Sequence, residues 1–149
     1  MRCRSDCAEV AVFVKASREV KEGTRYQSGE QFVHAIVEAV PDAQPVSTGS
    51  YGAQVWSSAT LALPLPEQVR AGDVFVAMAA RFKGKLGSST LVGANAPHVG
   101  IVSDFDVRKK KLRVFEVVDG RLEQGGHHLD ALKAGTVSVF RVLDRPAGN

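Results

Sequence analysis

The sequence predicts an α+β fold in which two helices pack on one face of a curved, mainly antiparallel sheet. Residues 28–40 and 51–63 carry apolar side chains at helical spacing. Residues 74–143 contain short runs rich in Val, Ile and Phe, and turn signals separate these runs. Helices followed by strands that short turns connect are typical of the α+β class.

The length and the composition favour one domain over residues 1–149. The chain is 44% hydrophobic and 23% charged, which suits one core and is too short for two. Its apolar runs are too short to span a membrane, and its start lacks a signal peptide, so we expect a cytoplasmic protein. Cys3 and Cys7 cannot cross-link a fold of this size, and with no second ligand pair nearby we expect no metal and no cofactor.

The N-terminal half is expected to contain a strand and then a helix. Residues 8–16 are rich in Val and predict a strand. Ser28 and Gln31 have the spacing of a capping box, and Pro41 ends the helix that they begin. His34 lies off the apolar stripe of this helix and is expected at the surface. The stripe comprises Phe32, Val33, Ile36, Val37 and Val40.

A second helix is predicted over residues 51–63, with Val55, Trp56, Ala59 and Leu63 on its apolar side. Strands are then expected over residues 74–78, 99–103, 112–118 and 136–143. The connections are a hairpin tip at 108–111, a turn at Asp119–Gly120 and a short turn at 129–133. The Gly- and Ser-rich stretch 83–97 is long for a loop, which is typical of a mobile or functional segment, and the tail 144–149 is expected to fray.

His98 is the first candidate for chemistry. It follows Pro97 and precedes the β-branched run of residues 99–102, so it should stand where a strand leaves a loop. Such edges commonly carry functional side chains on a rigid support. The competing interpretation is a hydrogen-bonded structural histidine, and a partner elsewhere in the chain must decide between them.

Two other features suggest sites of different kinds. His127 and His128 stand beside Gly125 and Gly126, but neighbouring side chains of a strand face opposite ways, so we expect solvated loop histidines. The net charge of +3 includes one cluster with Arg81, Lys83 and Lys85 and another at residues 108–111. These clusters keep open an alternative as a basic accessory subunit of a ribonucleoprotein, although no aromatic platform accompanies them and a solvated hairpin tip explains the second.

Several motifs together resemble the NlpC/P60 branch of the papain-like superfamily, in which a "GD" strand is paired with a later "HVGI" strand. A closer resemblance is to the cysteine-proteinase-fold domain of the fungal actin-patch protein Bbc1 and related plant proteins. It covers about residues 28–143. The motifs are Gly72–Val74, Pro97–Val102, Leu112–Glu116, Leu129–Leu132 and Gly135–Val142.

The resemblance implies a cysteine nucleophile at a helix N-terminus and a facing histidine at position 98, and we expect Glu116 to face that histidine. The family has Gly-Glu-Cys-Trp at the start of its second helix. With that helix placed at 51–63, the corresponding residues are Gly49–Gly52, so Tyr51, or Ala53 in a shifted alignment, occupies the nucleophile position. The attacking sulfur is then missing. The polar pair after the family's Glu is also replaced, by Val117 and Val118.

We therefore expect a catalytically inactive papain-like domain that serves as a protein-binding or scaffold module. Its partner would be a protein segment in a cleft near His98, and the resemblance implies an assembly of the actin cytoskeleton. The alternative is an active hydrolase of peptide or amide bonds in which Cys7, Ser50 or Ser57 attacks with His98 as the base.

Overall fold

The computed structural model describes residues 8–47, 49–59, 69–84 and 87–145, and it has the predicted α+β architecture. The strand order in the sheet is β1-β7-β2-β4-β5-β6, β3 pairs with β2, and all pairings are antiparallel. The helices are α1 (Ala8–Glu22) and α2 (Gly29–Glu38). The strands are β1 (Ala53–Ser57), β2 (Val74–Lys83), β3 (Ser89–Val92), β4 (His98–Asp106), β5 (Lys111–Val118), β6 (Arg121–His128) and β7 (Leu132–Arg141).

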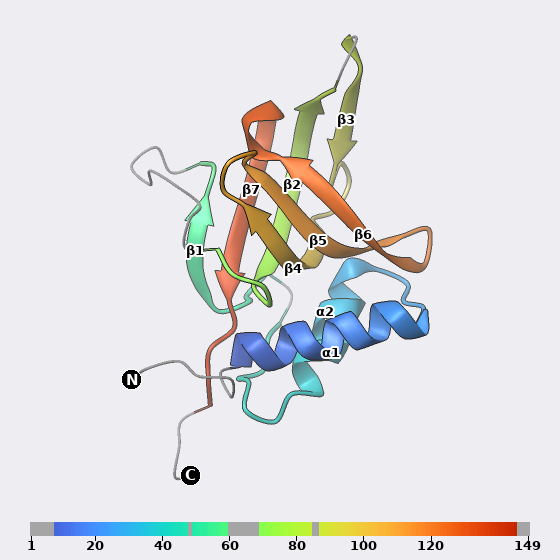
Figure 1. Cartoon of the computed structure of the whole chain (residues 1–149), viewed down its shortest axis with the longest axis vertical. Coiled ribbons are helices and arrows are strands. Elements are labelled where there is room, and N and C mark those ends of the chain that lie inside the picture. The colour runs from blue at the N-terminus through green and yellow to red at the C-terminus, as the bar shows by residue number, and fades with distance from the viewer. Residues whose placement is uncertain (1–7, 48, 60–68, 85–86, 146–149) are drawn as a thin grey trace.

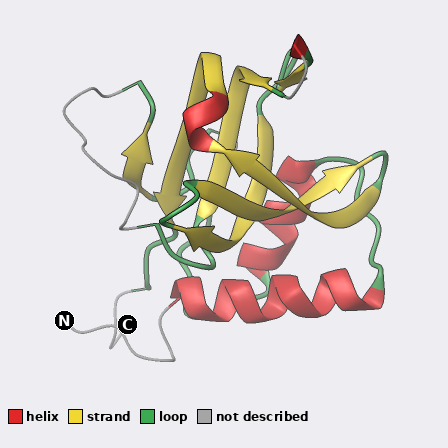
Figure 2. Cartoon of the chain, turned by 45° about the horizontal axis from the view of Figure 1, so that its top comes forward, coloured by secondary structure: helices red, strands yellow, loops and turns green. Residues whose placement is uncertain are grey.

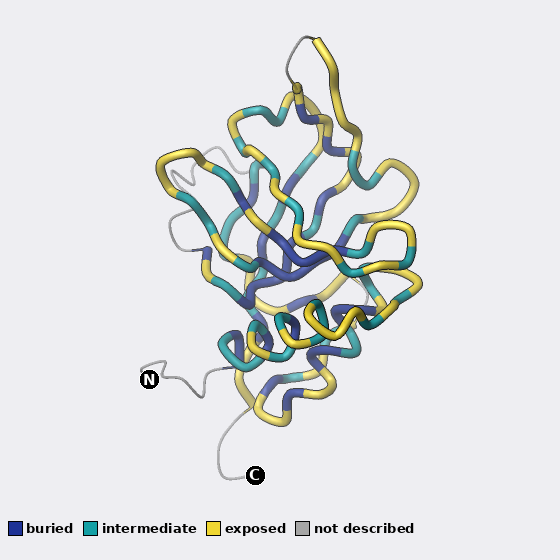
Figure 3. Tube along the Cα trace, turned by 45° about the vertical axis from the view of Figure 1, so that its right-hand side comes forward, coloured by how far each residue is buried: buried dark blue, intermediate teal, exposed yellow. Residues whose placement is uncertain are grey.

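Both helices lie on one side of the curved sheet (Figures 1 and 2). Because side chains alternate along a strand, the sheet has two apolar faces. One face packs on the helices, and the buried stretches of the chain meet at this layer boundary (Figure 3). Its centre includes Phe32, Ile36, Val74, Val99 and Ile101. The other face holds a second core, which includes Phe75, Val102, Leu112, Val114 and Val139.

The prediction of a strand over residues 8–16 is wrong, because this segment belongs to α1. The buried residues Ala8, Val12 and Ala16 lie four apart, which is the spacing of a helix face. The valines between them hide this period, since they are only partly buried or exposed. Contact with the sheet, where the Phe13 and Phe115 rings stack at 6.0 Å, therefore outweighs the strand propensity of valine.

The prediction of a helix over residues 51–63 is also wrong for the residues that the structure describes. Residues 53–57 form β1, which pairs with β7. The rest of that prediction, over residues 60–63, lies outside the described residues. Gly52 has φ +112°, and a Cβ there would collide with the carbonyl of Arg141. The chain therefore enters a close strand pairing at this point instead of a helix.

The other predicted helix, strands and turns are confirmed, with shifts at their ends. The helix that Ser28 and Gln31 start is α2, and Ser28 Oγ accepts the Gln31 N–H at 3.1 Å. The hairpin tip lies between β4 and β5, the turn at residues 119–120 joins β5 to β6, and a short 3-10 turn precedes β7. The stretch 83–97 differs from prediction in that it contains β3. The tail predicted to fray is held at Asp144, whose carboxylate accepts the Ala8 N–H at 2.7 Å, and residues 146–149 lie outside the described residues.

The Gly-Asp motif connects three strands. Gly72 has φ +97° and donates its N–H to the Val102 carbonyl, while the Val102 N–H returns to the Asp73 carbonyl. The fully buried Asp73 carboxylate accepts Arg141 Nε and Nη2, each at 2.9 Å, and the Arg70 backbone N–H at 2.8 Å. These bonds join the start of β2 to the middle of β4 and the end of β7.

Candidate functional site

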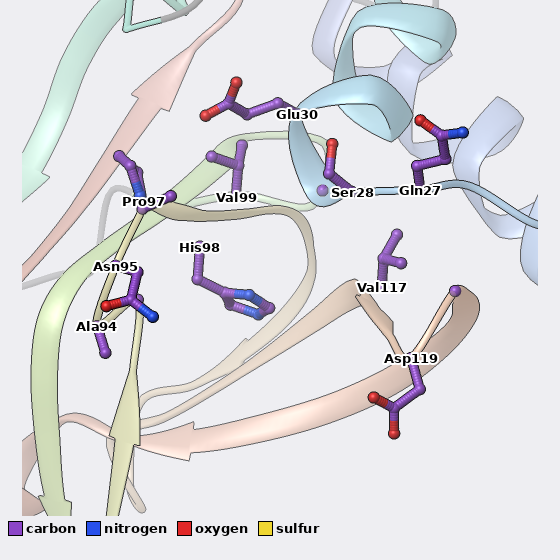
Figure 4. Close-up of a pocket in the computed structure, with 14 residues that line it drawn as sticks. Gln27, Ser28, Glu30, Ala94, Asn95, Pro97, His98, Val99, Val117 and Asp119 are labelled. Atoms are coloured by element: carbon purple, nitrogen blue, oxygen red, sulfur yellow. The ribbon is translucent and has the colours of Figure 1, made fainter.

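His98 is the first residue of β4 and lines a hollow of about 650 Å³. Three segments enclose this hollow, as Figure 4 shows: the start of α2, the loop that leads into β4 and the turn between β5 and β6. They are residues 27–30, residues 93–99, and Val117, Asp119 and Gly120. The predicted loop 83–97 thus contributes its last residues to the rim.

Glu116 holds the imidazole of His98. Its Oε1 lies 2.7 Å from His98 Nε2 and 3.2 Å from His127 Nε2, and its side chain is 10% exposed. Burial disfavours the charged carboxylate, but the hydrogen bonds and charges of His127 and His98 outweigh it and lower the pKa of Glu116 to about 2. An ionised carboxylate only accepts hydrogen bonds, so both histidines donate from Nε2. The other ring nitrogen of His98, Nδ1, is left for the hollow.

The prediction that His127 is a solvated loop residue is wrong. His127 lies on β6 with its side chain 12% exposed, stacked on Phe75 at 5.2 Å and 10° and tilted against Phe82 at 5.3 Å. The exposed His128 faces the other way, as strand geometry requires. A Cβ at Gly125 would collide with the Glu116 carboxylate. The missing side chain at Gly125 therefore leaves room for the Glu116 carboxylate beside His127.

The start of α2 reaches the hollow because Gly29 allows a very close approach to β4. A Cβ at position 29 would collide with the Val99 carbonyl, beside His98. Ser28 caps the helix, and the Gln31 side-chain oxygen accepts the Gln27 backbone N–H at 2.7 Å. The partly positive end of a helix therefore faces the same hollow as His98.

The predicted nucleophiles that can be placed do not share this hollow. Ser57 is on β1, which β7 and β2 separate from β4, and at ~4.8 Å per strand this puts its backbone roughly 14 Å from His98. Ser50 exchanges backbone hydrogen bonds with Ser47 and is exposed. Tyr51 lines a different hollow. Cys3 and Cys7 lie outside the described residues. Ala53, which occupies the nucleophile position in the shifted alignment, is in β1.

That second hollow is smaller, about 210 Å³, and mostly apolar. Val76, Met78 and Phe140 supply its apolar wall, and Glu30 and Pro97 belong to both hollows. Tyr51 is 2% exposed, and its hydroxyl has no hydrogen-bond partner among the described residues. Burial raises the pKa of the Tyr51 phenol, and the backbone of Gly49 opposes this shift only in part.

Other predicted features show no comparable arrangement. Arg81 and Lys83 belong to the β2–β3 hairpin and residues 108–111 to the β4–β5 hairpin, while Lys85 of the first predicted cluster lies outside the described residues. Among the described residues, no group of three His, Cys, Asp or Glu side chains is placed to bind a metal ion. None of the helices in the described ranges is long and apolar enough to cross a membrane.

A histidine at a strand start, a carboxylate on the next strand and a facing helix N-terminus are the framework of a cysteine-proteinase-like fold. The chain belongs to the AIM3/BBC1 cysteine proteinase-fold domain family, whose model matches residues 7–148. It is similar to the SH3 domain-containing protein C23A1.17 of Schizosaccharomyces pombe, with 27% identity over 124 residues. That match covers 76% of this chain and 8% of the relative's length. No solved structure gives a significant match.

Proposed function

We propose that this chain is a catalytically inactive papain-like domain of the NlpC/P60 type, one domain over residues 1–149, that binds a segment of another protein beside His98. The observation that carries the proposal is that His98 and the start of α2 face one hollow, and that this helix opens with Gly29, Glu30 and Gln31, with no thiol in its first turn. The histidine of a cysteine hydrolase needs such a thiol as its partner.

The position of the missing cysteine follows from the helices. The family's Gly-Glu-Cys-Trp opens its second helix, and the second helix of this chain opens with Gly29, Glu30, Gln31 and Phe32. Two residues match, the buried Phe32 replaces the Trp, and Gln31 stands where the cysteine would be. This alignment replaces the one at residues 49–52, which do not begin a helix. The Gln31 amide oxygen accepts the Gln27 backbone N–H, and an amide is no nucleophile.

Relatives support a role in protein assembly. The Schizosaccharomyces pombe relative is named for an SH3 domain, a module that binds Pro-rich segments, and this chain matches only a small part of it. A domain of this kind would work in the cytoplasm as one binding module among several, and the resemblance to an actin-patch protein suggests the actin cytoskeleton as the setting.

Alkylation kinetics test the inactivity. The wild-type chain and His98→Gln are treated with iodoacetamide, and mass spectrometry follows Cys3 and Cys7 separately. We expect equal Cys7 rates in both proteins and no cleavage of fluorescein-labelled casein, because no base activates the thiol. Alkylation of Cys7 at least tenfold faster than that of Cys3, lost in His98→Gln and accompanied by casein cleavage, would show an active cysteine hydrolase.

A fluorophosphonate probe applies the same test to the alcohol nucleophiles. We expect no labelling of Ser50 or Ser57, since neither shares the hollow of His98. Labelling of either serine that disappears in His98→Gln would establish a serine hydrolase in place of the inactive domain.

A further inference from the structure

The two hollows form neighbouring parts of one groove. Glu30 and Pro97 line both of them, so an occupant of the larger hollow lies next to the smaller one. The larger hollow is open and polar, whereas the smaller one is lined mainly by apolar side chains. The volume of the smaller hollow, about 210 Å³, is below the ~300–1,000 Å³ typical of small-molecule sites. A volume of this size suits a single side chain.

The charge of the groove is opposite to that of the whole chain. The chain carries a net charge of +3, but the residues that line the groove include the carboxylates of Glu30 and Asp119 and no lysine or arginine. Neither carboxylate forms an ion pair within the described ranges. These groups favour a cationic, hydrogen-bond-donating occupant.

The apolar part of the groove contains two groups whose surroundings are incomplete. Met78 is 53% exposed, although it stands beside the buried core strands. The Tyr51 hydroxyl is buried without a partner among the described residues, and buried polar groups in proteins are normally hydrogen-bonded. An occupant that covers Met78 would remove its apolar side chain from water, whereas the Tyr51 hydroxyl is already enclosed by the protein itself.

From these observations we propose that the groove binds an extended peptide that carries a lysine or arginine and, two residues away, an apolar side chain. The basic side chain lies against Glu30, which borders both hollows, and the apolar side chain enters the slot at Met78. Side chains two residues apart point to the same side of an extended chain. This inference rests on the proposed function, since it names the chemistry of the protein segment bound beside His98.

Titration of the ¹⁵N-labelled chain, followed by NMR, tests the proposal with three synthetic octapeptides in a Gly-Ser background. The first has Lys and Leu two residues apart, the second has Glu for the Lys, and the third has Ser for the Leu. We expect the first to shift the amide signals of Gly29, Gly93 and Gly120 and to bind at least about fivefold more tightly than the others.

Two variants of the chain test the contact of the basic side chain with Glu30 and the contact of the apolar side chain with Met78 separately. Glu30→Gln should weaken binding of the first peptide about fivefold and Met78→Ser about tenfold, whereas Glu38→Gln, an exposed carboxylate at the far end of α2, should leave it unchanged. Equal binding of the three peptides, absence of any shift up to millimolar peptide, or insensitivity to Glu30→Gln would overturn the proposal.

Failure of this inference is distinguishable from failure of the proposed function. A peptide that binds but shifts other signals would leave a peptide-binding domain without this groove. A peptide that binds here and is cleaved would refute inactivity while leaving the groove in place. Shifts of the same glycine signals with protein concentration alone would identify a second copy of the chain as the occupant and overturn the peptide proposal.

Discussion

Replacement of Glu116 by glutamine should destabilise the chain in a pH-dependent way. The pKa of Glu116 falls from an ordinary 4.5 to about 2 in the folded protein, because two imidazole N–H groups bind its buried carboxylate. A tenfold change in an acid dissociation constant corresponds to ~1.4 kcal/mol, so the lowered pKa contributes about 3 kcal/mol to the free energy of unfolding at pH 7. Because the folded pKa is the lower one, this contribution is complete above pH 4.5 and is lost as the pH falls towards 2.

Urea unfolding of the wild type and Glu116→Gln at pH 7, 5, 4 and 3 measures this contribution. The difference between the two proteins should be about 3 kcal/mol at pH 7 and should shrink steadily below pH 4.5. Glu123→Gln is the matched control, because Glu123 pairs with Glu116 in strand register but its side chain is 45% exposed, and it should change stability by less than ~0.5 kcal/mol. A Glu116→Gln effect below ~1 kcal/mol at pH 7, or one that does not vary with pH, would refute the reasoning.

Three further substitutions, each followed by urea unfolding, test separate features. Asp73→Ala should cost about 3–5 kcal/mol, because it removes the buried partner of the Arg141 guanidinium; a cost below ~1 kcal/mol would mean that the pair does not hold the strands. Ser28→Ala should cost about 1 kcal/mol through loss of the helix cap, and an unchanged midpoint would contradict the capping geometry. Tyr51→Phe should leave stability unchanged or raise it by up to about 1 kcal/mol, since the hydroxyl has no described partner; a clear loss would reveal one.

The sequence predicted those parts of the fold whose local pattern agrees with their final surroundings. The cap at Ser28, the apolar stripe of α2 and the alternating strands from β4 to β5 needed no knowledge of distant contacts. The first helix was missed because two of the buried positions on its face are alanines, while Val10 and Val14, which lie away from the centre of that face, give residues 8–16 the appearance of a strand. The prediction of a helix over residues 51–63 failed because β1 is stabilised by its pairing with β7, and no local sequence pattern reveals that pairing.

For the site, the sequence identified His98 and suggested that Glu116 faces it, and the structure places the two 2.7 Å apart. It missed His127, since only the register of β5 with β6 brings that ring to the same carboxylate. It also placed the helix N-terminus near residue 50. The close contact of Gly29 with Val99, which brings the start of α2 to the site, depends on tertiary packing and leaves no periodic pattern.

The proposed site depends on one arrangement, in which Glu116 binds the Nε2–H of both His98 and His127 and leaves His98 Nδ1 towards the groove. A long-range ¹H–¹⁵N NMR spectrum of the imidazole rings at neutral pH tests it directly, because it shows which ring nitrogen carries the proton. We predict protons on Nε2 of both rings, with both signals displaced in Glu116→Gln. A His98 ring protonated only on Nδ1, or signals unchanged by Glu116→Gln, would contradict this arrangement.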